Sequence, residues 1–211
     1  MIKKLPLFII VCLLAISSQA LAETELEIEG LEGPLLSNVE AYISGIPEED
    51  YSVSLRFQAR LQESVTDALK ALGYYQPVTT FTIEGEQSDH TLIMNIEAGA
   101  PVIIYVSDIV ISGEAATDED FIKAVDNSGL NLGQVINHGR YESLKSTLQN
   151  LALRKGYFDG DFTTNLLEIA PGRHQAMVRL HYDSGKRYSF GDTSIDGSQI
   201  EEKKSSLNYS V

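Results

Sequence analysis

The clearest pattern along the chain is a run of apolar residues at helical spacing that ends in a glycine and two aromatic residues. Over residues 57–72 every third or fourth position is apolar, which is the period of one face of a helix. Gly73 follows directly and supplies the left-handed conformation in which many helices end. The apolar positions of this predicted long helix are Phe57, Leu61, Val65, Leu69 and Leu72.

Alternating apolar and polar residues on either side of this helix predict strands. A short strand is predicted for LEIEG, and a β-hairpin for TTFTIEG and HTLIMNIEAG. Ser37 and Glu40 have the spacing of a capping box, which predicts a short helix that runs to about Ser44. The unit is therefore strand, helix, helix, strand, strand. The hairpin positions predicted to face inward are Phe81, Ile83, Leu92, Met94 and Ile96.

The same order of elements recurs at a fixed offset. The first strands end at Gly30 and Gly113, and 113 − 30 = 83. The long helices end at Gly73 and Gly156, and 156 − 73 is again 83. A further strand-like segment ends at Gly197, and 197 − 113 = 84, so we infer two full repeats and the opening of a third. The offset also holds within the helices, where Leu61, Val65 and Ala68 fall on Leu144, Leu148 and Leu151.

The second repeat is predicted to contain the same five elements. Its first strand is VSDIVISG, and Thr117 is expected to cap a helix whose first turn is Asp118-Glu119-Asp120. A longer helix is predicted over about 139–155, and DFTTNLLEI pairs with HQAMVRLHYD around a turn. Two helices on one face of a three-stranded sheet make a two-layer α+β domain, so the chain is predicted to be a tandem of small α+β domains.

The residues after each long helix are interpreted as core or hinge positions, with contact to a ligand as the lesser alternative. The aromatic residues are expected to begin the second strand and to pack back on the helix. This structural set consists of Gly73, Tyr74, Tyr75, Gly156, Tyr157 and Phe158.

The first 22 residues have the pattern of a cleaved signal peptide. Lys3 and Lys4 precede a short apolar run, and small residues at Ala20 and Ala22 favour cleavage after Ala22. A membrane anchor is the alternative, but about a dozen apolar residues are too few to span a bilayer. Cys12 lies within this segment and is removed with it.

Composition narrows the function of the mature chain. The formal net charge of the whole sequence is −14, which disfavours binding to nucleic acid or anionic lipid surfaces. No cysteine remains after residue 22, so disulfides, thiol catalysis and cysteine metal sites are excluded. The hydrophobic fraction of 43% is too high for a disordered acidic tail.

The sequence offers only weak candidates for a catalytic or metal-binding site. His174 and His181 flank one predicted strand, but their spacing puts them on opposite faces of the sheet. Carboxylates at 118–120 suit the first turn of a helix, where free N–H groups and the dipole favour them, better than a cation site. We therefore expect no catalytic residues, no metal site and no cofactor, although an exported enzyme with an unrecognised site remains an alternative.

The repeats resemble POTRA (polypeptide-transport-associated) domains of outer-membrane assembly factors. The segments that carry this resemblance are KALGYY, LALRKGYFD and SGKRYSFG, together with the order and spacing of the elements. The pattern is especially similar to the TamA group of this family. The resemblance implies a β-α-α-β-β fold with a three-stranded mixed sheet. The predicted boundaries are 1–22 for the signal peptide, 23–104 and 105–184 for two POTRA domains, and 185–211 for the start of a third.

The resemblance also implies a function without catalysis. TamA-like proteins act at the periplasmic face of the bacterial outer membrane in the insertion or secretion of outer-membrane proteins such as autotransporters. In that family the POTRA domains precede a membrane β-barrel, which is absent from residues 1–211, so the sequence is interpreted as incomplete. Expected partners are unfolded outer-membrane clients and an inner-membrane-anchored protein of the TamB type. The POTRA regions of two-partner secretion pores or of general barrel-assembly factors are the alternatives.

The implied mode of client binding is β-augmentation, in which an extended segment adds to an open sheet edge. The second strand of each repeat, residues 78–84 and 161–168, is the candidate edge by family resemblance. The candidate edge residues are Val78, Thr80, Thr82, Phe162, Thr163 and Thr164.

Overall fold

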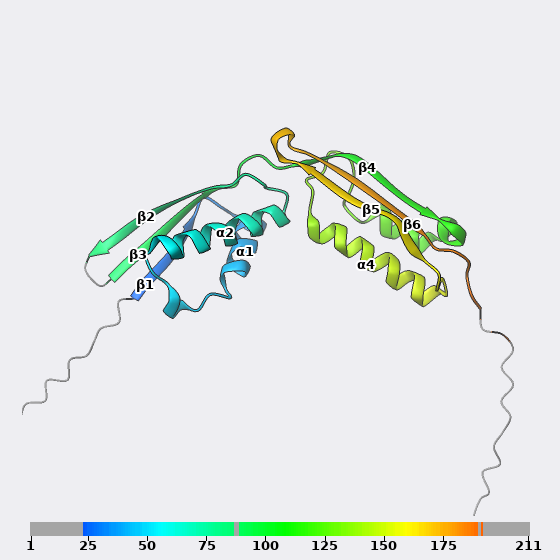
Figure 1. The fold of residues 1–211 in the computed structure, drawn as a ribbon, viewed down its shortest axis with the longest axis horizontal. Coiled ribbons are helices and arrows are strands. Elements are labelled where there is room, and N and C mark those ends of the chain that lie inside the picture. Colours follow the sequence, from blue (N-terminus) through cyan, green and yellow to red (C-terminus); the bar gives the residue numbers. More distant parts are fainter. Residues whose placement is uncertain (1–22, 87–88, 190, 192–211) are drawn as a thin grey trace, which may run out of the picture.

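The computed structural model describes residues 23–86, 89–189 and 191, and it shows two α+β units in series (Figure 1). Each unit places its two helices on one face of a small sheet, in two layers. The first unit consists of β1 (Glu23–Glu29), α1 (Gly33–Ile43), a 3₁₀ turn (Glu48–Asp50), α2 (Leu55–Ala71), β2 (Val78–Glu86) and β3 (Asp89–Glu97). The second consists of β4 (Ile103–Ser112), a 3₁₀ turn (Gly113–Thr117), α3 (Glu119–Asp126), α4 (His138–Lys155), β5 (Asp161–Ala170), a 3₁₀ turn (Pro171–Arg173) and β6 (Gln175–Asp183).

Both sheets have the same mixed topology. The strand order is β1-β3-β2 in the first unit and β4-β6-β5 in the second. The first strand of each unit runs parallel to the central strand, and the hairpin strands are antiparallel. Because a parallel neighbour needs a crossover, the helix pair of each unit connects the first strand to the hairpin. The α+β prediction with a three-stranded mixed sheet is confirmed.

The repeat offset appears in the element boundaries. The helices α2 and α4 begin at Leu55 and His138, and the strands β2 and β5 begin at Val78 and Asp161; 138 − 55 and 161 − 78 both give 83. The last strands begin at 89 and 175, an offset of 175 − 89 = 86, because the second hairpin is extended by a 3₁₀ turn. The link between the units is 98–102, since β3 ends at Glu97 and β4 begins after it, and we propose this link as the domain boundary in place of 104/105.

Each unit buries its own hydrophobic core between the helices and the inner face of the sheet. In the first core, the predicted positions Leu61, Val65 and Leu69 of α2 are fully buried against β3. In the second core, Phe121 meets Tyr157 edge-on at 5.7 Å between ring centroids. The central strands contribute the deepest apolar side chains, which are Leu92, Met94 and Ile96 in β3 and Val178, Leu180 and Tyr182 in β6.

Two predicted helix caps are wrong. Ser37 lies inside α1, which begins at Gly33 with Pro34 in its first turn and no side-chain cap. Proline lacks an N–H and has a helical φ, so it begins a helix more effectively than an interior serine. In the second unit Asp118 is the cap, because its side chain accepts a hydrogen bond from the Asp120 N–H at 3.0 Å, and Thr117 belongs to the preceding 3₁₀ turn.

One inward-facing prediction also fails. Ile83 is 49% exposed, although its cross-strand partner Leu92 is completely buried. Ile83 lies on β2, which has no strand on its outer side among the described residues, so that side of the residue is open to solvent. Phe81 on the same strand is partly buried against the first core.

The predicted signal peptide and most of the predicted third domain fall on residues 1–22, 190 and 192–211, outside the described part of the chain.

Replacing Gly156 with alanine should destabilise the second unit by about 1–3 kcal/mol. Gly156 caps α4 in the left-handed region with φ of 88°, and an added Cβ would lie 2.6 Å from the carbonyl oxygen of Tyr188. Urea unfolding followed by circular dichroism measures the change. The control is Gly172→Ala, because a Cβ at Gly172 meets no atom within 4 Å and its φ is not left-handed. Equal stability of the two variants would contradict the capping role.

Candidate interaction surface

The sheets present four outer strands, and they differ in how open they are. In a three-stranded sheet only the central strand pairs on both sides, so β1 and β2 are edges of the first sheet and β4 and β5 are edges of the second. Unpaired backbone N–H and C=O groups at such edges can pair with another extended chain. Within the described part of the chain, these four edges are the candidates for a β-augmentation site.

The edge of β2 is regular along its whole length. Its pairing with β3 runs without a register shift from Val78 to Glu86. The candidate residues Thr80 and Thr82 are exposed, and the side chain of Val78 is 55% exposed. Exposed apolar side chains on an unbroken edge provide both backbone pairing and side-chain burial for an incoming strand. This edge has the features that the sequence-based hypothesis requires.

The edge of β5 is interrupted near its start. The register shifts between Phe162 and Thr164, so Thr163 is the extra residue of a β-bulge, and its hydroxyl donates to the His181 carbonyl at 3.4 Å. The ring of Phe162 turns inward and meets Tyr182 at 4.9 Å between centroids. A bulge twists an edge strand and breaks the alignment of its free backbone groups. Of the two predicted edges, β2 is therefore the more open.

The other two edges were missed by sequence reasoning, and each is protected over at least part of its length. On β1 the side chains of Glu25, Glu27 and Glu29 are all exposed on the outer sheet face, and charged residues of one sign disfavour pairing with another strand. At the start of β4, the Ile104 N–H donates to the Gln134 carbonyl at 2.8 Å, so a loop covers that edge. The sequence did contain an indication of which strands are edges. The third strand of each repeat is rich in apolar residues and takes the central position, which leaves the first strand at an edge.

The residues after α2 lie in a turn that leads to β2 and contacts the second unit. The second strands begin at Val78 and Asp161, where the predicted ranges 78–84 and 161–168 begin. The expectation that the aromatic residues start these strands is wrong, because those residues lie before them. The Gly73 carbonyl accepts a hydrogen bond from the Val102 N–H at 2.8 Å, and Val102 belongs to the second core. Gly73 has φ of 92°, and a Cβ there would contact the Ile136 carbonyl of the second unit.

The two tyrosines of this turn have different partners. Tyr74 packs against the first core, whereas Tyr75 packs against the core of the second unit. The Tyr75 hydroxyl hydrogen-bonds Nε2 of His138, which is the first residue of α4. Burial raises the pKa of Tyr75 to about 12 and lowers the pKa of His138 below its ordinary value. Of the predicted hinge set, Gly73 and Tyr75 therefore take part in the contact between the units.

The second unit repeats part of this arrangement at its far end. The Gly156 carbonyl accepts a hydrogen bond from the Tyr188 N–H at 2.7 Å, much as Gly73 accepts from Val102. Tyr157 is buried in the second core, and Phe158, the counterpart of Tyr75, is 58% exposed with its ring 5.9 Å from that of Tyr188. The positions equivalent by the repeat therefore keep the backbone contact and differ in side-chain environment.

The closest ion pairs of the described residues have structural roles and do not converge on a site. Within residues 23–86, 89–189 and 191 no group of three or more potential metal ligands converges, and the helices of that part are too short or too polar to cross a membrane. The predicted acidic turn has a structural role, since Lys155 pairs with Asp118 at 2.7 Å and with Asp120 at 2.5 Å. The hydrogen bond from Lys155 lowers the pKa of Asp118. His181 contacts Asp108 at 2.9 Å across the sheet face.

Replacing Tyr75 with alanine should loosen the contact between the units and cost about 1–3 kcal/mol, because a partly buried aromatic side chain is lost. Because residues 23–211 lack cysteine, one engineered cysteine in each unit can carry a spin label for distance measurements. The distance distribution should broaden in the variant. Tyr42→Ala, at an exposed position on α1, is the matched control. An unchanged distance distribution in Tyr75→Ala would show that Tyr75 does not hold the two units together.

The joint should also weaken in mild acid. Because burial holds the pKa of His138 below its unfolded value, the unfolded chain binds the proton more readily, and stability is lost as the pH falls through the unfolded value of about 6.5. Nearby Glu142 acts in the opposite sense on His138 and reduces the effect. Urea unfolding between about pH 7.5 and pH 5 should show a smaller decrease in His138→Gln than in the wild type. Parallel curves for the two proteins would refute the assignment.

Comparison with known proteins agrees with this architecture. Residues 25–98 match the family model described as POTRA domain TamA domain 1, and residues 104–184 match the POTRA model described as surface antigen variable number repeat. Among solved structures, BamA POTRA3-5 from Haemophilus influenzae is 15% identical with a TM-score of 0.36, and the alignment covers 77% of this chain and 60% of that one. The N-terminal domain of Omp85 from Thermosynechococcus elongatus is 16% identical with a TM-score of 0.38, over 75% of this chain and 60% of that one. POTRA1-2 of the periplasmic domain of Omp85 from Anabaena is 13% identical with a TM-score of 0.34, over 80% and 96%.

The structural likenesses are too distant to add to the argument, and the chain spans 60% of the length of the BamA and Thermosynechococcus structures that it matches. The two family models together cover most of the chain and coincide with the two structural units. The chain therefore belongs to the POTRA-domain family, with one POTRA domain in each half of its described structure.

Proposed function

We propose that this chain is the periplasmic POTRA region of a TamA-like outer-membrane assembly factor. Its role is non-catalytic: it holds unfolded outer-membrane proteins such as autotransporters during their insertion or secretion. The match of the first unit to the first TamA domain favours this group over other POTRA proteins. The proposal places the chain on the periplasmic side of the outer membrane, after removal of the predicted signal peptide.

The observation that carries the proposal is the open edge of β2 in the TamA-type domain. A client strand on this edge would continue the sheet beyond β2 and would cover Val78 and Ile83, both of which are largely exposed. Pairing through the backbone reads little of the client sequence, which suits a factor that handles many unfolded proteins. Binding should be weak, because ordering a flexible segment offsets much of the contact energy.

A partner anchored in the inner membrane, of the TamB type, is a second part of the proposal. POTRA domains that join such a partner to the outer membrane need a fixed relation between units, and the Tyr75–His138 contact provides a joint between them.

A photoreactive residue at position 82 should crosslink to a client. Thr82 is exposed on β2, so p-benzoylphenylalanine there lies beside the expected position of the added strand. We expect crosslinked adducts when an unfolded outer-membrane barrel protein is present at micromolar concentration. Mass spectrometry detects these adducts. The matched control is the same residue at Gln62, on the exposed side of α2. Equal adduct yields from both positions would rule out β2 as the client-binding site.

The assembly role has its own test in cells. Deleting residues 23–184 from the full protein should leave the abundance of its membrane part unchanged and abolish surface display of an autotransporter client. Display at the wild-type level would refute the proposed role, whatever the crosslinking shows.

A further inference from the structure

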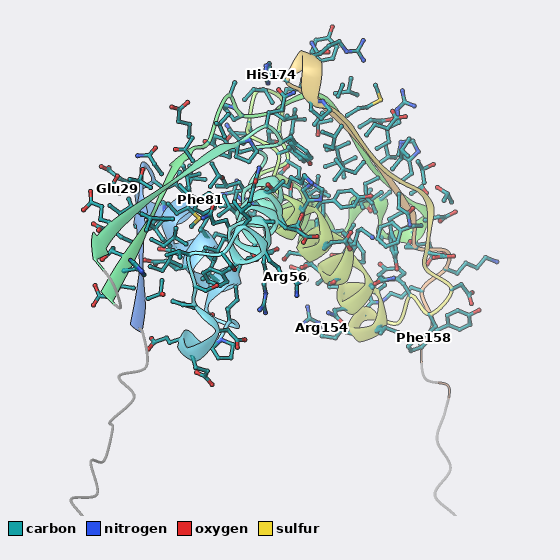
Figure 2. All side chains as sticks on the ribbon, turned by 60° about the vertical axis from the view of Figure 1, so that its left-hand side comes forward. Glu29, Arg56, Phe81, Arg154, Phe158 and His174 are labelled. Atoms are coloured by element: carbon teal, nitrogen blue, oxygen red, sulfur yellow. The ribbon has the colours of Figure 1, made fainter. Side chains whose placement is uncertain are left out.

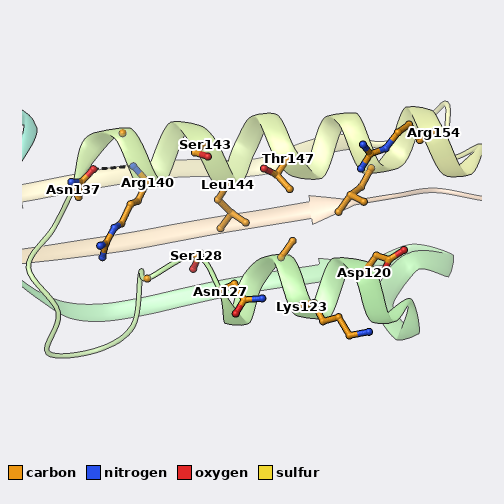
Figure 3. A pocket seen from close by; sticks show the side chains of 14 residues that line it. Asp120, Lys123, Asn127, Ser128, Asn137, Arg140, Ser143, Leu144, Thr147 and Arg154 are labelled. Carbon is orange, nitrogen blue, oxygen red and sulfur yellow. Dashed lines mark hydrogen bonds between the residues drawn. The ribbon is translucent and has the colours of Figure 1, made fainter.

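A groove of about 880 Å³ runs between the two helices of the second domain (Figure 3). Arg140 lies at one end of it, close to Asn137, and Arg154 lies at the other end. Between them the α4 side of the groove carries two hydroxyl side chains and two leucines. The residues on this side are Arg140, Ser143, Leu144, Thr147, Leu151 and Arg154. The opposite wall is α3, which contributes Lys123.

The groove is positively charged although the protein is acidic. Arg140 and Arg154 take part in no ion pair with the described residues. The one acidic residue of the lining, Asp120, is paired with Lys155, and Lys123 is paired with Glu119 at 3.0 Å. Among the described residues, the two guanidinium groups are therefore the unpaired charges of the groove lining.

The first domain lacks this feature at the equivalent positions. The repeat offset places Phe57 and Ala71 where the second domain has its two arginines, since 140 − 83 = 57 and 154 − 83 = 71. Phe57 is buried in the first core. In addition, the Asn38 side chain donates to the Ala68 carbonyl at 2.7 Å and ties α1 directly to α2. The cationic groove is therefore a property of the second domain and not a consequence of the shared fold.

We propose that this groove binds an extended acidic segment of a partner protein. Arg140 and Arg154 are separated by about 21 Å along the helix, at 1.5 Å for each residue. An extended chain with carboxylates about six positions apart spans nearly the same length, at about 3.3 Å for each residue. A single small anion reaches only one of the two guanidinium groups. Arginine forks bind carboxylates with two parallel hydrogen bonds, and Ser143 and Thr147 offer hydroxyls to the intervening backbone.

This site is separate from the β2 edge. The groove lies between helices, whereas the proposed client edge is a strand of the other domain. The two surfaces allow the chain to hold an extended client strand and an acidic partner segment at the same time. Failure of one site leaves the other intact, which makes the two proposals separable.

The test uses a fluorescent peptide of about ten residues, in which two aspartates about six positions apart are separated by serine and threonine. Fluorescence anisotropy with the purified chain should show binding that weakens as the salt concentration rises. The same peptide with asparagine in place of aspartate should bind at least about tenfold more weakly, because both charge-assisted hydrogen bonds are lost.

Arg140→Gln and Arg154→Gln should each weaken binding of the aspartate peptide by about tenfold. Arg173→Gln, in the exposed turn between β5 and β6, makes the same charge change and should have no effect. Arg140 lies against Gly129 of a neighbouring loop, so Arg154→Gln, in the last turn of α4, tests the site even if Arg140→Gln fails to fold. Both folded variants should keep the client crosslink from position 82.

Three results would overturn the proposal. They are equal binding of the aspartate and asparagine peptides, unchanged binding by Arg154→Gln, and absence of binding at millimolar peptide. Binding to vesicles of anionic lipid that depends on Arg154, without peptide binding, would identify a membrane surface and also reject the protein partner.

Discussion

The left-handed glycine after each long helix is the constraint on which the structure depends. Gly73 and Gly156 have φ of 92° and 88°, a region that other residues enter only at a cost. This conformation ends the helix and turns the chain back toward the sheet. At both positions the glycine carbonyl accepts a hydrogen bond from the chain that follows the domain, Val102 in one case and Tyr188 in the other. The same residue therefore ends a helix and fixes the point where the next segment leaves.

The size of the sheet explains why its edges matter. A three-stranded sheet has two outer strands for one central strand, so most of its strands are at risk of pairing with another chain. The structure protects β1 with glutamates, β4 with a loop and β5 with a bulge. Among the four described edges, only β2 has a regular register together with exposed apolar residues such as Val78. Figure 2 shows Glu29, one of the glutamates of β1, at the outer side of the first domain. In the same view Arg56 and Arg154 extend from the helices away from the sheets.

Patterns that depend on burial were visible in the sequence, and patterns that depend on contacts between distant residues were not. The faces of α2 and α4 follow helical periodicity, because Leu61 and Leu144 each need an apolar environment. The residues that begin the helices were predicted less well, since Ser37 and Thr117 compete with Pro34 and Asp118 a few residues away. The strand order could not be read from the alternation alone, because an edge strand and a central strand can share the same period.

The candidate surfaces show the same limit. Sequence reasoning selected β2 and β5 together by family resemblance, because each is the second strand of its repeat. The bulge at Thr163 comes from its place in the register with β6 and leaves no local signature. Tyr75 was expected to serve its own domain, and its insertion beside His138 depends on how two units meet.

Duplication with a conserved core leaves the surfaces of the two domains free to diverge. Core positions such as Leu61 and Leu144 occupy equivalent sites and are fixed by close packing, which tolerates little change in volume. Positions outside the cores are less restricted, so a partly buried Ala71 in one domain corresponds to an exposed Arg154 in the other. A regular strand edge is found in the first domain and a cationic groove in the second. Two copies of one fold thus present two chemically different surfaces, and the joint at Tyr75 holds them in one molecule.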